Sequence, residues 1–459
     1  MLFNSYQFIF IFLPFTLIGY FILSKKSNII SKLFLIFVSL FFYSWWNFIY
    51  LPIIIFSILF NYNISKILYR YNQKTILFIS IILNLSLLGY FKYRDFFVEN
   101  INYIFDSNFT LLHLALPLAI SFFTFQQISY LVDCYKKDIK EYNFLDYTLF
   151  VTFFPQLIAG PIVHYREMIP QFNKNSNLTK NYHNIALGIF IFSIGLFKKV
   201  AIADTFGGWV DSGFDTSTRL NIFEAWSTSL SYTFQLYFDF SGYTDMAIGS
   251  ALLFNITLPT NFNSPYKSYN IQEFWRRWHI TLSNFLRDYI YIPLGGSRVG
   301  LFQTNINILI TFLLAGLWHG ASWLFVFWGF LHGLALVIYN LWDKFSFRLN
   351  RYISWFITFN FINISWVFFR AKEWEDAIKI LKSMIDINSI KDINFSINIY
   401  KIIAILLAFF IILILQNSNY YIKHFKYSIY NLLFIIISIV SFHFISITYS
   451  KSIFLYFNF

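Results

Sequence analysis

The stretch that decides the fold runs from Val299 to Trp342 and reads VGLFQTNINILITFLLAGLWHGASWLFVFWGFLHGLALVIYNLW. It contains no Lys, Arg, Asp or Glu and is long enough for two membrane-spanning helices, each of which needs about 20 mostly apolar residues. Its centre carries His319, a titratable side chain at bilayer depth. Because desolvating such a group is costly there, a functional histidine is the default interpretation. The alternative is a histidine that packs between helices and hydrogen-bonds a neighbouring helix.

The composition of the chain is that of a membrane protein. Of its 459 residues, 58% are hydrophobic and 12% are charged, whereas soluble domains carry about 25% charged residues. The net charge of +12 comes mostly from short loops between apolar runs. The positive-inside rule produces this pattern, so a nucleic-acid-binding protein is excluded. The residues before Lys25 lack a basic n-region and a cleavage site, and we expect a first spanning helix there. With one cysteine, Cys134, we expect neither an intramolecular disulfide nor a cysteine-based metal cluster.

The apolar runs predict one all-α polytopic membrane domain over residues 1–459, with about eleven or twelve spanning helices. The expected spans are 6–23, 33–50, 52–68, 76–91, 111–131, 184–202, 223–240, 304–319, 321–341, 353–369, 399–416 and 427–447. The segments 147–163 and 241–259 are predicted to be re-entrant. Non-helical backbone at that depth must be buried in protein or line a wet cavity, so both indicate an internal cavity. The loop 370–392 is expected to form an amphipathic helix at the outer surface.

A concentrated basic segment lies just before the deciding stretch. Residues 270–294 read NIQEFWRRWHITLSNFLRDYIYIPL, and apolar residues recur there at spacings of three and four: Trp275, Trp278, Leu282, Phe285 and Tyr289. This spacing predicts an interfacial amphipathic helix over 270–292. Arg276, Arg277 and Arg287 fall largely elsewhere and predict a phosphate-binding mouth, because arginine pairs well with phosphate oxygens. The alternative is a positive-inside anchor with interfacial tryptophans.

Other polar side chains interrupt the apolar sequence nearby. His279 adjoins the arginines and is either catalytic or a structural hydrogen-bonding residue. His332 is expected to pack. Asp239 and Asp245 lie in FQLYFDFSGYTD at 234–245. They either form satisfied hydrogen bonds between helices or line a cavity wall that orients a histidine.

Five long runs are more specific than any single motif. They are FFPQLIAGPIVHYREMIPQF at 153–172, GLFKKVAIAD at 195–204, YTFQLYFDFSGYTDMAIGSALLF at 232–254, FNSPYKSYNIQEFWRRWHITLSNFLRDYIYIPLGG at 262–296, and GLWHGASWLFVFWGFLHG at 316–333. Together they resemble the membrane-bound O-acyltransferase (MBOAT) superfamily, in the bacterial branch of alginate and peptidoglycan O-acetyltransferases. The resemblance implies many helices around a central tunnel, with residues 147–334 as the catalytic core. It also implies that His319 is the family's near-invariant histidine and His279 its second catalytic position.

The resemblance implies an acyl-CoA-dependent O-acetyltransferase. Such an enzyme takes an acetyl group from cytoplasmic acetyl-CoA and passes it across the bacterial cytoplasmic (inner) membrane to a cell-envelope polysaccharide. The acceptor is expected to be peptidoglycan, with alginate or another exopolysaccharide as the alternative. An extracytoplasmic esterase-like transferase is the expected partner protein. We expect no tightly bound cofactor and no metal.

Residue roles follow from the same resemblance. His319 acts as a general base or as an acyl acceptor, and the sequence does not separate the two. The substrate-binding candidates are Arg276, Arg277, Arg287, Trp275, Trp278, Trp318, Asp239 and Asp245. A different class of protein stays open, a transporter or flippase with His319 in a proton relay. The chain shows no inverted repeat of the kind that many transporters have.

Overall fold

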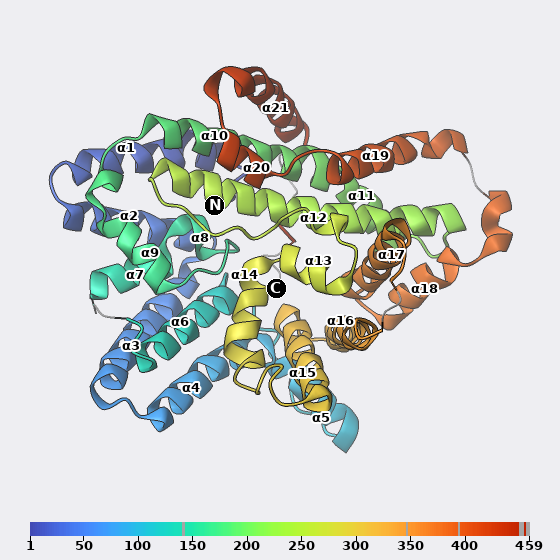
Figure 1. The fold of residues 1–459 in the computed structure, drawn as a ribbon, viewed down its shortest axis with the longest axis horizontal. Coiled ribbons are helices and arrows are strands. Elements are labelled where there is room, and N and C mark those ends of the chain that lie inside the picture. The colour runs from blue at the N-terminus through green and yellow to red at the C-terminus, as the bar shows by residue number, and fades with distance from the viewer. Residues whose placement is uncertain (140–142, 346–347, 393–394, 449–453, 456–459) are drawn as a thin grey trace. The chain divides into compact units, whose positions relative to one another are not determined.

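The computed structural model describes residues 1–139, 143–345, 348–392, 395–448 and 454–455 (Figure 1). Every regular element in these residues is a helix, as the sequence predicts. The chain forms two compact units, each assembled from segments that are distant in sequence. The first comprises Met1–Leu196, Tyr243–Pro259 and Phe425–Phe459, and the second Phe197–Gly242 and Thr260–His424. That residues 1–459 act as one domain stays a prediction.

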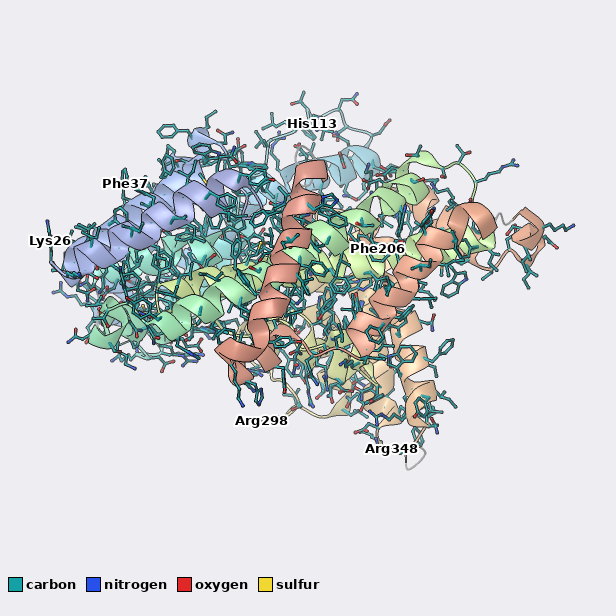
Figure 2. The ribbon with its side chains drawn as sticks, turned by 90° about the horizontal axis from the view of Figure 1, so that it is seen from above. Lys26, Phe37, His113, Phe206, Arg298 and Arg348 are labelled. Carbon is teal, nitrogen blue, oxygen red and sulfur yellow. The ribbon has the colours of Figure 1, made fainter. Side chains whose placement is uncertain are left out.

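The first unit contains helices from the N-terminal part of the chain and from two later segments. They are η1 (Gln7–Phe12), α1 (Leu13–Ser24), α2 (Asn28–Ser44), η2 (Phe48–Tyr50), α3 (Leu51–Tyr71), α4 (Lys74–Lys92), α5 (Arg94–Phe105), α6 (Ile120–Tyr135), α7 (Phe144–Thr152), α8 (Phe154–Leu157), α9 (Tyr165–Asn173), η3 (Asn175–Leu178), most of α10 (Tyr182–Phe197), the C-terminal part of α12 (Ile222–Leu253) and α21 (Tyr427–Thr448). Apolar side chains such as Phe37 of α2 are exposed on its surface (Figure 2). This exposure suits a surface that faces lipid.

The second unit contains the predicted site residues except Asp245. Its helices are η4 (Lys198–Ala203), α11 (Asp204–Asp211), η5 (Ser212–Thr216), the first part of α12, η6 (Pro265–Lys267), α13 (Ile271–Arg277), α14 (Ile280–Leu286), η7 (Arg287–Tyr291), α15 (Leu301–His319), α16 (Trp323–Trp342), α17 (Arg351–Arg370), α18 (Trp374–Met384), η8 (Ile387–Asp392), α19 (Phe395–Leu413) and α20 (Ser418–His424).

Seven helices among the described residues are long and apolar enough to span a membrane. They are Gln7–Ser24, Phe48–Tyr71, Lys74–Lys92, Tyr182–Thr216, Leu301–His319, Trp323–Trp342 and Arg351–Arg370, and a bent pair, Ile399–Leu413 with Ser418–His424, would make eight. The sequence predicts more spans: the runs at 33–50, 111–131 and 223–240 fall on helices of another kind, and in the run at 427–447 only Ile436–Ile445 counts as a short apolar helix. Helices α2 and α6 have 17 and 16 residues. Helix α12 has 32 residues but carries three carboxylates and many hydroxyl groups.

One of the two predicted re-entrant segments is a continuous helix. Helix α12 runs through Ser241 and Gly242 without a break and ends at Leu253, so the expected interruption after residue 240 is wrong. A single glycine within a helix costs only about 1 kcal/mol, and the buried neighbours on α12 outweigh it. The other segment is broken, as predicted. Residues 158–164 between α8 and α9 are non-helical and largely buried.

Helices α15 and α16 form a close antiparallel pair (Figure 1). A Cβ atom added at Gly316 would lie 2.2 Å from the carbonyl oxygen of Phe325, and one added at Gly329 would lie 2.3 Å from that of Phe312. Both glycines are therefore required for the helices to approach each other. Exposed Arg298 before α15 and exposed Arg348 after α16 lie at one end of the pair (Figure 2). The last residue of α15, His319, is at the other end.

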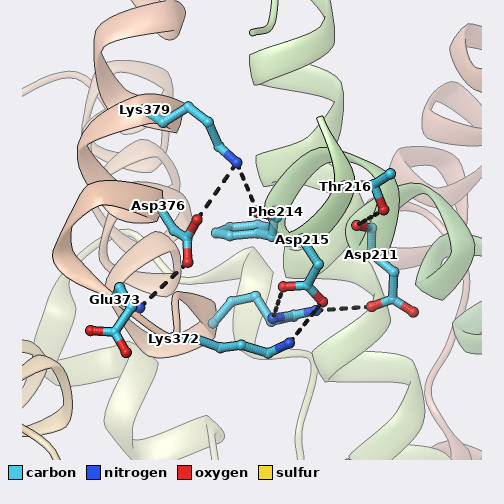
Figure 3. A network of polar contacts seen from close by, with 9 residues as sticks. Asp211, Phe214, Asp215, Thr216, Lys372, Glu373, Asp376 and Lys379 are labelled. Atoms are coloured by element: carbon cyan, nitrogen blue, oxygen red, sulfur yellow. Dashed lines mark hydrogen bonds and ion pairs between the residues drawn. The ribbon is translucent and has the colours of Figure 1, made fainter. Parts of the chain in front are cut away.

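Ion pairs tie the C-terminal end of α17 to η5 and α11 (Figure 3). The Arg370 guanidinium binds Asp211 at 2.9 Å and Asp215 at 2.7 Å, and it lies 5.3 Å from the ring centroid of Phe214. From α18, Lys379 donates to the Phe214 carbonyl oxygen at 2.8 Å. Helix α18 buries Ala377, Ile380 and Met384 on one face, so the predicted amphipathic helix is present. Its place at the outer surface stays a prediction.

Candidate active site

His319 ends helix α15 inside a group of aromatic rings. It is only 2% exposed. Its ring centroid lies 5.2 Å from Trp328 at 90° and 5.0 Å from Phe369 at 71°. The following residue, Gly320, is extended, with φ −165° and ψ 153°. Because these rings exclude water, electrostatic and proton-transfer interactions at this imidazole are stronger than in solvent.

His279 lies at a sharp break between α13 and α14. The predicted continuous helix over 270–292 is wrong, because α13 ends at Arg277 and α14 begins at Ile280. In an uninterrupted helix the amides of Ile280 and Thr281 would bond to carbonyls four residues earlier. Both are instead taken by Asn261: the Ile280 amide donates to its carbonyl oxygen at 2.9 Å, and the Thr281 amide to its side-chain oxygen at 3.3 Å.

The backbone of His279 is left-handed, with φ +42° and ψ 54°. Such a conformation costs a non-glycine residue roughly 1–2 kcal/mol and persists only where the surrounding structure holds it. Here the bonds to Asn261 hold the C-terminal side of the break, and the Asn263 amide, which donates to the Arg277 carbonyl oxygen at 2.9 Å, holds the other side. The rings of Trp275, Trp278 and Phe285 around the break are buried, so these residues form core and not an interfacial face.

The hydrogen bonds to Asn261 also determine the tautomer of His279. The Asn261 side-chain oxygen accepts from the Thr281 amide and, at 2.9 Å, from the Thr281 hydroxyl. It lies 3.1 Å from Nδ1 of His279, so Nδ1 must donate and the lone pair resides on Nε2. Burial lowers the pKa of His279 to about 3. The ring is therefore neutral, with Nε2 as the atom that can accept a proton.

Trp318 joins the two predicted catalytic histidines. Its ring centroid lies 6.2 Å from that of His279 and 5.0 Å from that of His319. The indole is 4% exposed. Both imidazoles therefore belong to one buried aromatic cluster, which the sequence predicts only through the family resemblance.

A cavity of about 420 Å³ lies beside this cluster in the second unit. Its lining comes from α13, α14, η7, α15 and α16: Gln272, Trp275, Arg276, Ile280, Ser283, Asn284, Leu286, Arg287, Tyr291, Ile308, Thr311, Phe312 and Leu336. Arg276 and Arg287 are both exposed at its wall, and Arg287 also pairs with the neighbouring Asp288 at 2.7 Å. On α15, Ile308, Phe312, Ala315 and His319 follow one another at spacings of four, three and four and share one face. His319 lies on this same face of α15, about two turns beyond Phe312, the last residue of the helix that lines the cavity.

Two of the predicted substrate-binding residues have other roles. Arg277 pairs with Glu273 at 2.8 Å and donates to the carbonyl oxygen of Asn263 at 3.2 Å. Trp278 is 1% exposed, and its ring stacks on Phe274 with centroids 5.6 Å apart. We therefore place Arg277 among the local structural contacts and Trp278 in the core.

The two predicted carboxylates lie in different units. In the second unit, Asp239 accepts from the Lys199 ammonium at 2.6 Å, and Lys199 also pairs with Asp204 at 2.8 Å. The π-helical turn η4 aligns Lys199 with Asp204, because residues five apart face the same side in such a turn. Asp245 is buried in the first unit. That either carboxylate orients a histidine stays a prediction.

Sequence reasoning missed the residues that hold the histidines in place. Asn261 lies 18 residues before His279, outside the basic segment, and no local pattern marks it. Trp328 and Phe369 are recognisable only as apolar residues of spanning helices. His332, by contrast, packs as predicted, with both ring nitrogens in hydrogen bonds.

Comparison with known proteins gives consistent results. The model of the membrane-bound O-acyltransferase family, MBOAT, matches residues 134–372. A peptidoglycan O-acetyltransferase of Helicobacter pylori is 53% identical over 425 residues, covering 85% of this chain and 81% of the relative. A probable alginate O-acetylase, AlgI, of Pseudomonas aeruginosa is 40% identical over 84% of this chain and 75% of the relative. A teichoic acid D-alanyltransferase of Bacillus subtilis is 28% identical over 56% of this chain and 69% of the relative.

Proposed function

The chain belongs to the membrane-bound O-acyltransferase family, and we propose that it O-acetylates the peptidoglycan of a bacterial cell envelope. It is a multi-pass membrane protein. The relative named for peptidoglycan is 53% identical, against 40% for the relative named for alginate, which favours peptidoglycan as the acceptor. A transporter or flippase has no counterpart among these relatives, and the acyltransferase is the function we adopt.

The donor we propose is acetyl-CoA. The observation that carries this proposal is the cavity along α15, with Arg276 and Arg287 at its wall and His319 at the end of the same helix face. Arginine guanidinium groups bind phosphate oxygens through charge-assisted hydrogen bonds. From Ile308 to His319 the helix rises about 16 Å. A donor that binds through phosphates and carries its thioester on a long arm suits this separation.

At His319 the acetyl group is transferred from the thioester to a hydroxyl group. As a general base, the imidazole takes the proton of the attacking hydroxyl group while the hydroxyl oxygen bonds to the thioester carbonyl carbon. The carbon–sulfur bond then breaks, and the proton passes to the leaving thiolate. As an acyl carrier, the imidazole itself attacks the carbonyl carbon, the carbon–sulfur bond breaks, and the thiolate leaves with the proton from the ring. The hydroxyl then attacks the acetyl-imidazole, the carbon–nitrogen bond breaks, and the hydroxyl proton returns to the imidazole. Neutral His279, with its lone pair on Nε2, assists by positioning the donor or sharing the proton.

The remaining parts of the proposal concern the surroundings of the enzyme. The basic end of the α15–α16 pair, marked by Arg298 and Arg348, faces the cytoplasm under the positive-inside rule. His319 then lies toward the opposite side of the cytoplasmic (inner) membrane. An extracytoplasmic esterase-like transferase receives the acetyl group there and completes its transfer to the polysaccharide.

The test is transfer of radiolabelled acetyl groups in proteoliposomes. The purified chain, labelled acetyl-CoA and peptidoglycan fragments are combined with and without a candidate partner. We expect His319→Ala to abolish transfer and His113→Asn, a change at an exposed histidine of the first unit, to leave it unchanged. Wild-type transfer by His319→Ala would overturn the assignment. In parallel reactions with alginate in place of peptidoglycan fragments, label on alginate and not on peptidoglycan would change the acceptor.

A second experiment separates the two roles of His319. Rapid quenching of the enzyme with labelled acetyl-CoA, in the absence of acceptor, leaves label on the protein only if the imidazole carries the acetyl group. Absence of protein-bound label, together with normal transfer once acceptor is added, identifies a general base.

A further inference from the structure

His332 of α16 is a buried histidine for which the proposed reaction has no use. It is 0% exposed. The Trp275 indole N–H donates to Nδ1 at 3.2 Å, and Nε2 lies 2.9 Å from the Ser365 hydroxyl oxygen. That hydroxyl donates its own hydrogen to the Ile362 carbonyl oxygen at 2.8 Å. Nε2 must therefore carry the ring proton and donate it to Ser365.

This arrangement fixes one tautomer of a neutral ring. Nδ1 is committed as an acceptor and Nε2 as a donor, so neither nitrogen is available to take up a proton. The two hydrogen bonds also fix the orientation of the ring, since they come from different helices, α13 and α17. His332 thus presents a fixed acceptor to the Trp275 indole and is not an acid or base.

Trp275 is the residue through which this orientation reaches the site. Its ring lines the cavity next to Arg276. It packs on Phe312, another lining residue, with centroids 4.9 Å apart. On its other side it contacts Trp328 at 5.9 Å, and Trp328 lies edge-on against His319. The indole is therefore both a wall of the cavity and a neighbour of the rings around His319.

Helix α13 is too short to hold this indole by itself. It has seven residues and ends at Arg277, because Asn261 takes the backbone amides of Ile280 and Thr281. The orientation of Trp275 therefore depends on its contacts with α15 and α16, and the hydrogen bond to His332 is the directional one among them. Rotation of the indole would move the part of the cavity wall that Trp275 forms.

The geometry points to His332 as a positioning residue for the donor: it holds Trp275 as the wall against which the acyl-CoA arm lies. The inference rests on the proposed function. It assigns His332 an effect on donor affinity and none on the chemistry at His319. Loss of the bond should raise the donor KM about tenfold, which corresponds to about 1.4 kcal/mol and to one net hydrogen bond.

Two substitutions separate the two bonds of His332. In His332→Asn the amide oxygen takes the place of Nδ1 and still accepts from Trp275. In His332→Gln the amide nitrogen takes the place of Nε2 and still donates to Ser365, but the acceptor for Trp275 is lost. Trp275→Phe removes the same bond from the opposite partner and keeps a ring at the cavity wall.

The experiment measures donor KM, kcat and the affinity for a non-hydrolysable acetyl-CoA analogue in the full-length wild type and the three variants. We expect His332→Gln and Trp275→Phe to weaken analogue binding about tenfold at unchanged kcat and pH profile. His332→Asn should bind like wild type. The double variant His332→Gln/Trp275→Phe should be no weaker than either single one, because both remove one bond.

Three outcomes overturn the inference. One is equal analogue affinity in His332→Gln and His332→Asn. Another is a fall in kcat at unchanged KM, and the third is full additivity in the double variant. Monodisperse protein with an unchanged thermal midpoint identifies folded variants, and Trp275→Phe tests the same bond if His332→Gln does not fold. If wild-type protein binds no analogue, the proposed donor is wrong; if it binds and the variants do not differ, only the role of His332 is wrong.

Discussion

The neutral, buried state of His279 makes the stability of the protein depend on pH in a defined direction. In the native chain its pKa is about 3, and the ordinary value is 6.5. Between these values the unfolded chain binds a proton that the native site excludes, so acid favours unfolding. The free energy of unfolding is therefore highest above pH 6.5. It falls as the pH decreases from 6.5 toward 3.

The size of the effect follows from the two pKa values. At pH 5, one histidine with these values costs about 2 kcal/mol of stability relative to pH 8. In a chain of this length the loss corresponds to a shift in thermal midpoint of about 2 °C. His279→Asn removes the titration. Asparagine tolerates the left-handed backbone and its amide nitrogen can donate to Asn261.

The assay is thermal unfolding in detergent at pH 8 and pH 5 for wild type and His279→Asn. Titration of all other groups is common to both proteins and cancels in the comparison. We expect the wild type to lose about 2 kcal/mol more than the variant between the two pH values. Equal losses in the two proteins would refute a neutral, proton-excluding His279.

A second substitution reverses the effect. Asn261→Asp keeps an oxygen acceptor 3.1 Å from Nδ1 of His279 and adds a negative charge. At an effective dielectric constant of about 20, a unit charge at this distance stabilises the imidazolium by about 5 kcal/mol, or about four pH units. The pKa of His279 would rise from about 3 to near 7. The acid loss assigned to His279 should then disappear, and an unchanged loss would contradict the calculation.

Three further predictions concern other parts of the structure. Gly329→Ala should destabilise by about 1–3 kcal/mol, because its Cβ would lie 2.3 Å from a carbonyl oxygen of α15, and should also lower transfer. A Cβ atom added at Gly89 would meet no neighbouring atom within 4 Å. Gly89→Ala should therefore leave the free energy of unfolding unchanged or raise it by up to about 1 kcal/mol, as measured by thermal unfolding. Arg276→Ala should raise donor KM about tenfold by loss of a phosphate contact, whereas Arg277→Ala should leave it unchanged. Lys199→Met should cost about 3–5 kcal/mol, because it strands two buried carboxylates.

Each of these has an outcome that would contradict it. Equal thermal midpoints for Gly329→Ala and Gly89→Ala would show that the helix pair adjusts freely. An equal change in donor KM for Arg276→Ala and Arg277→Ala would show that loss of positive charge, and not loss of a contact in the cavity, raises the KM. A Lys199→Met protein as stable as wild type would mean that the two carboxylates are neutralised some other way.

The long apolar helices could be predicted from the sequence because hydropathy alone determines them. The spans expected at 304–319 and 321–341 are found as α15 and α16, with ends that differ by at most three residues. The continuity of α12 was missed because Ser241 and Gly242 usually mark a break. In the structure they are buried within a helix whose hydrogen-bond ladder continues past them.

The site itself depends on long-range contacts that no local pattern contains. The break at His279 requires Asn261 to take two backbone amides of the predicted helix. Arg276 and Arg277 are adjacent and chemically equal, but successive helix residues point about 100° apart. The placement of α15 and α16 decides that Arg276 faces the cavity, whereas the pair of Arg277 with Glu273, four residues earlier on the same helix, is a local contact.

Helix α15 also fixes the distance between the cavity and His319. Its middle residues Ile308, Thr311 and Phe312 line the cavity and its last residue is His319, so the distance along the helix between the cavity and the imidazole is set by a count of residues. Inserting one residue between Phe312 and His319 would lengthen the helix by about 1.5 Å and turn the imidazole by about 100°. Apart from Gly316 and Trp318, this stretch of α15 should therefore tolerate exchange of side chains far better than any change in its length.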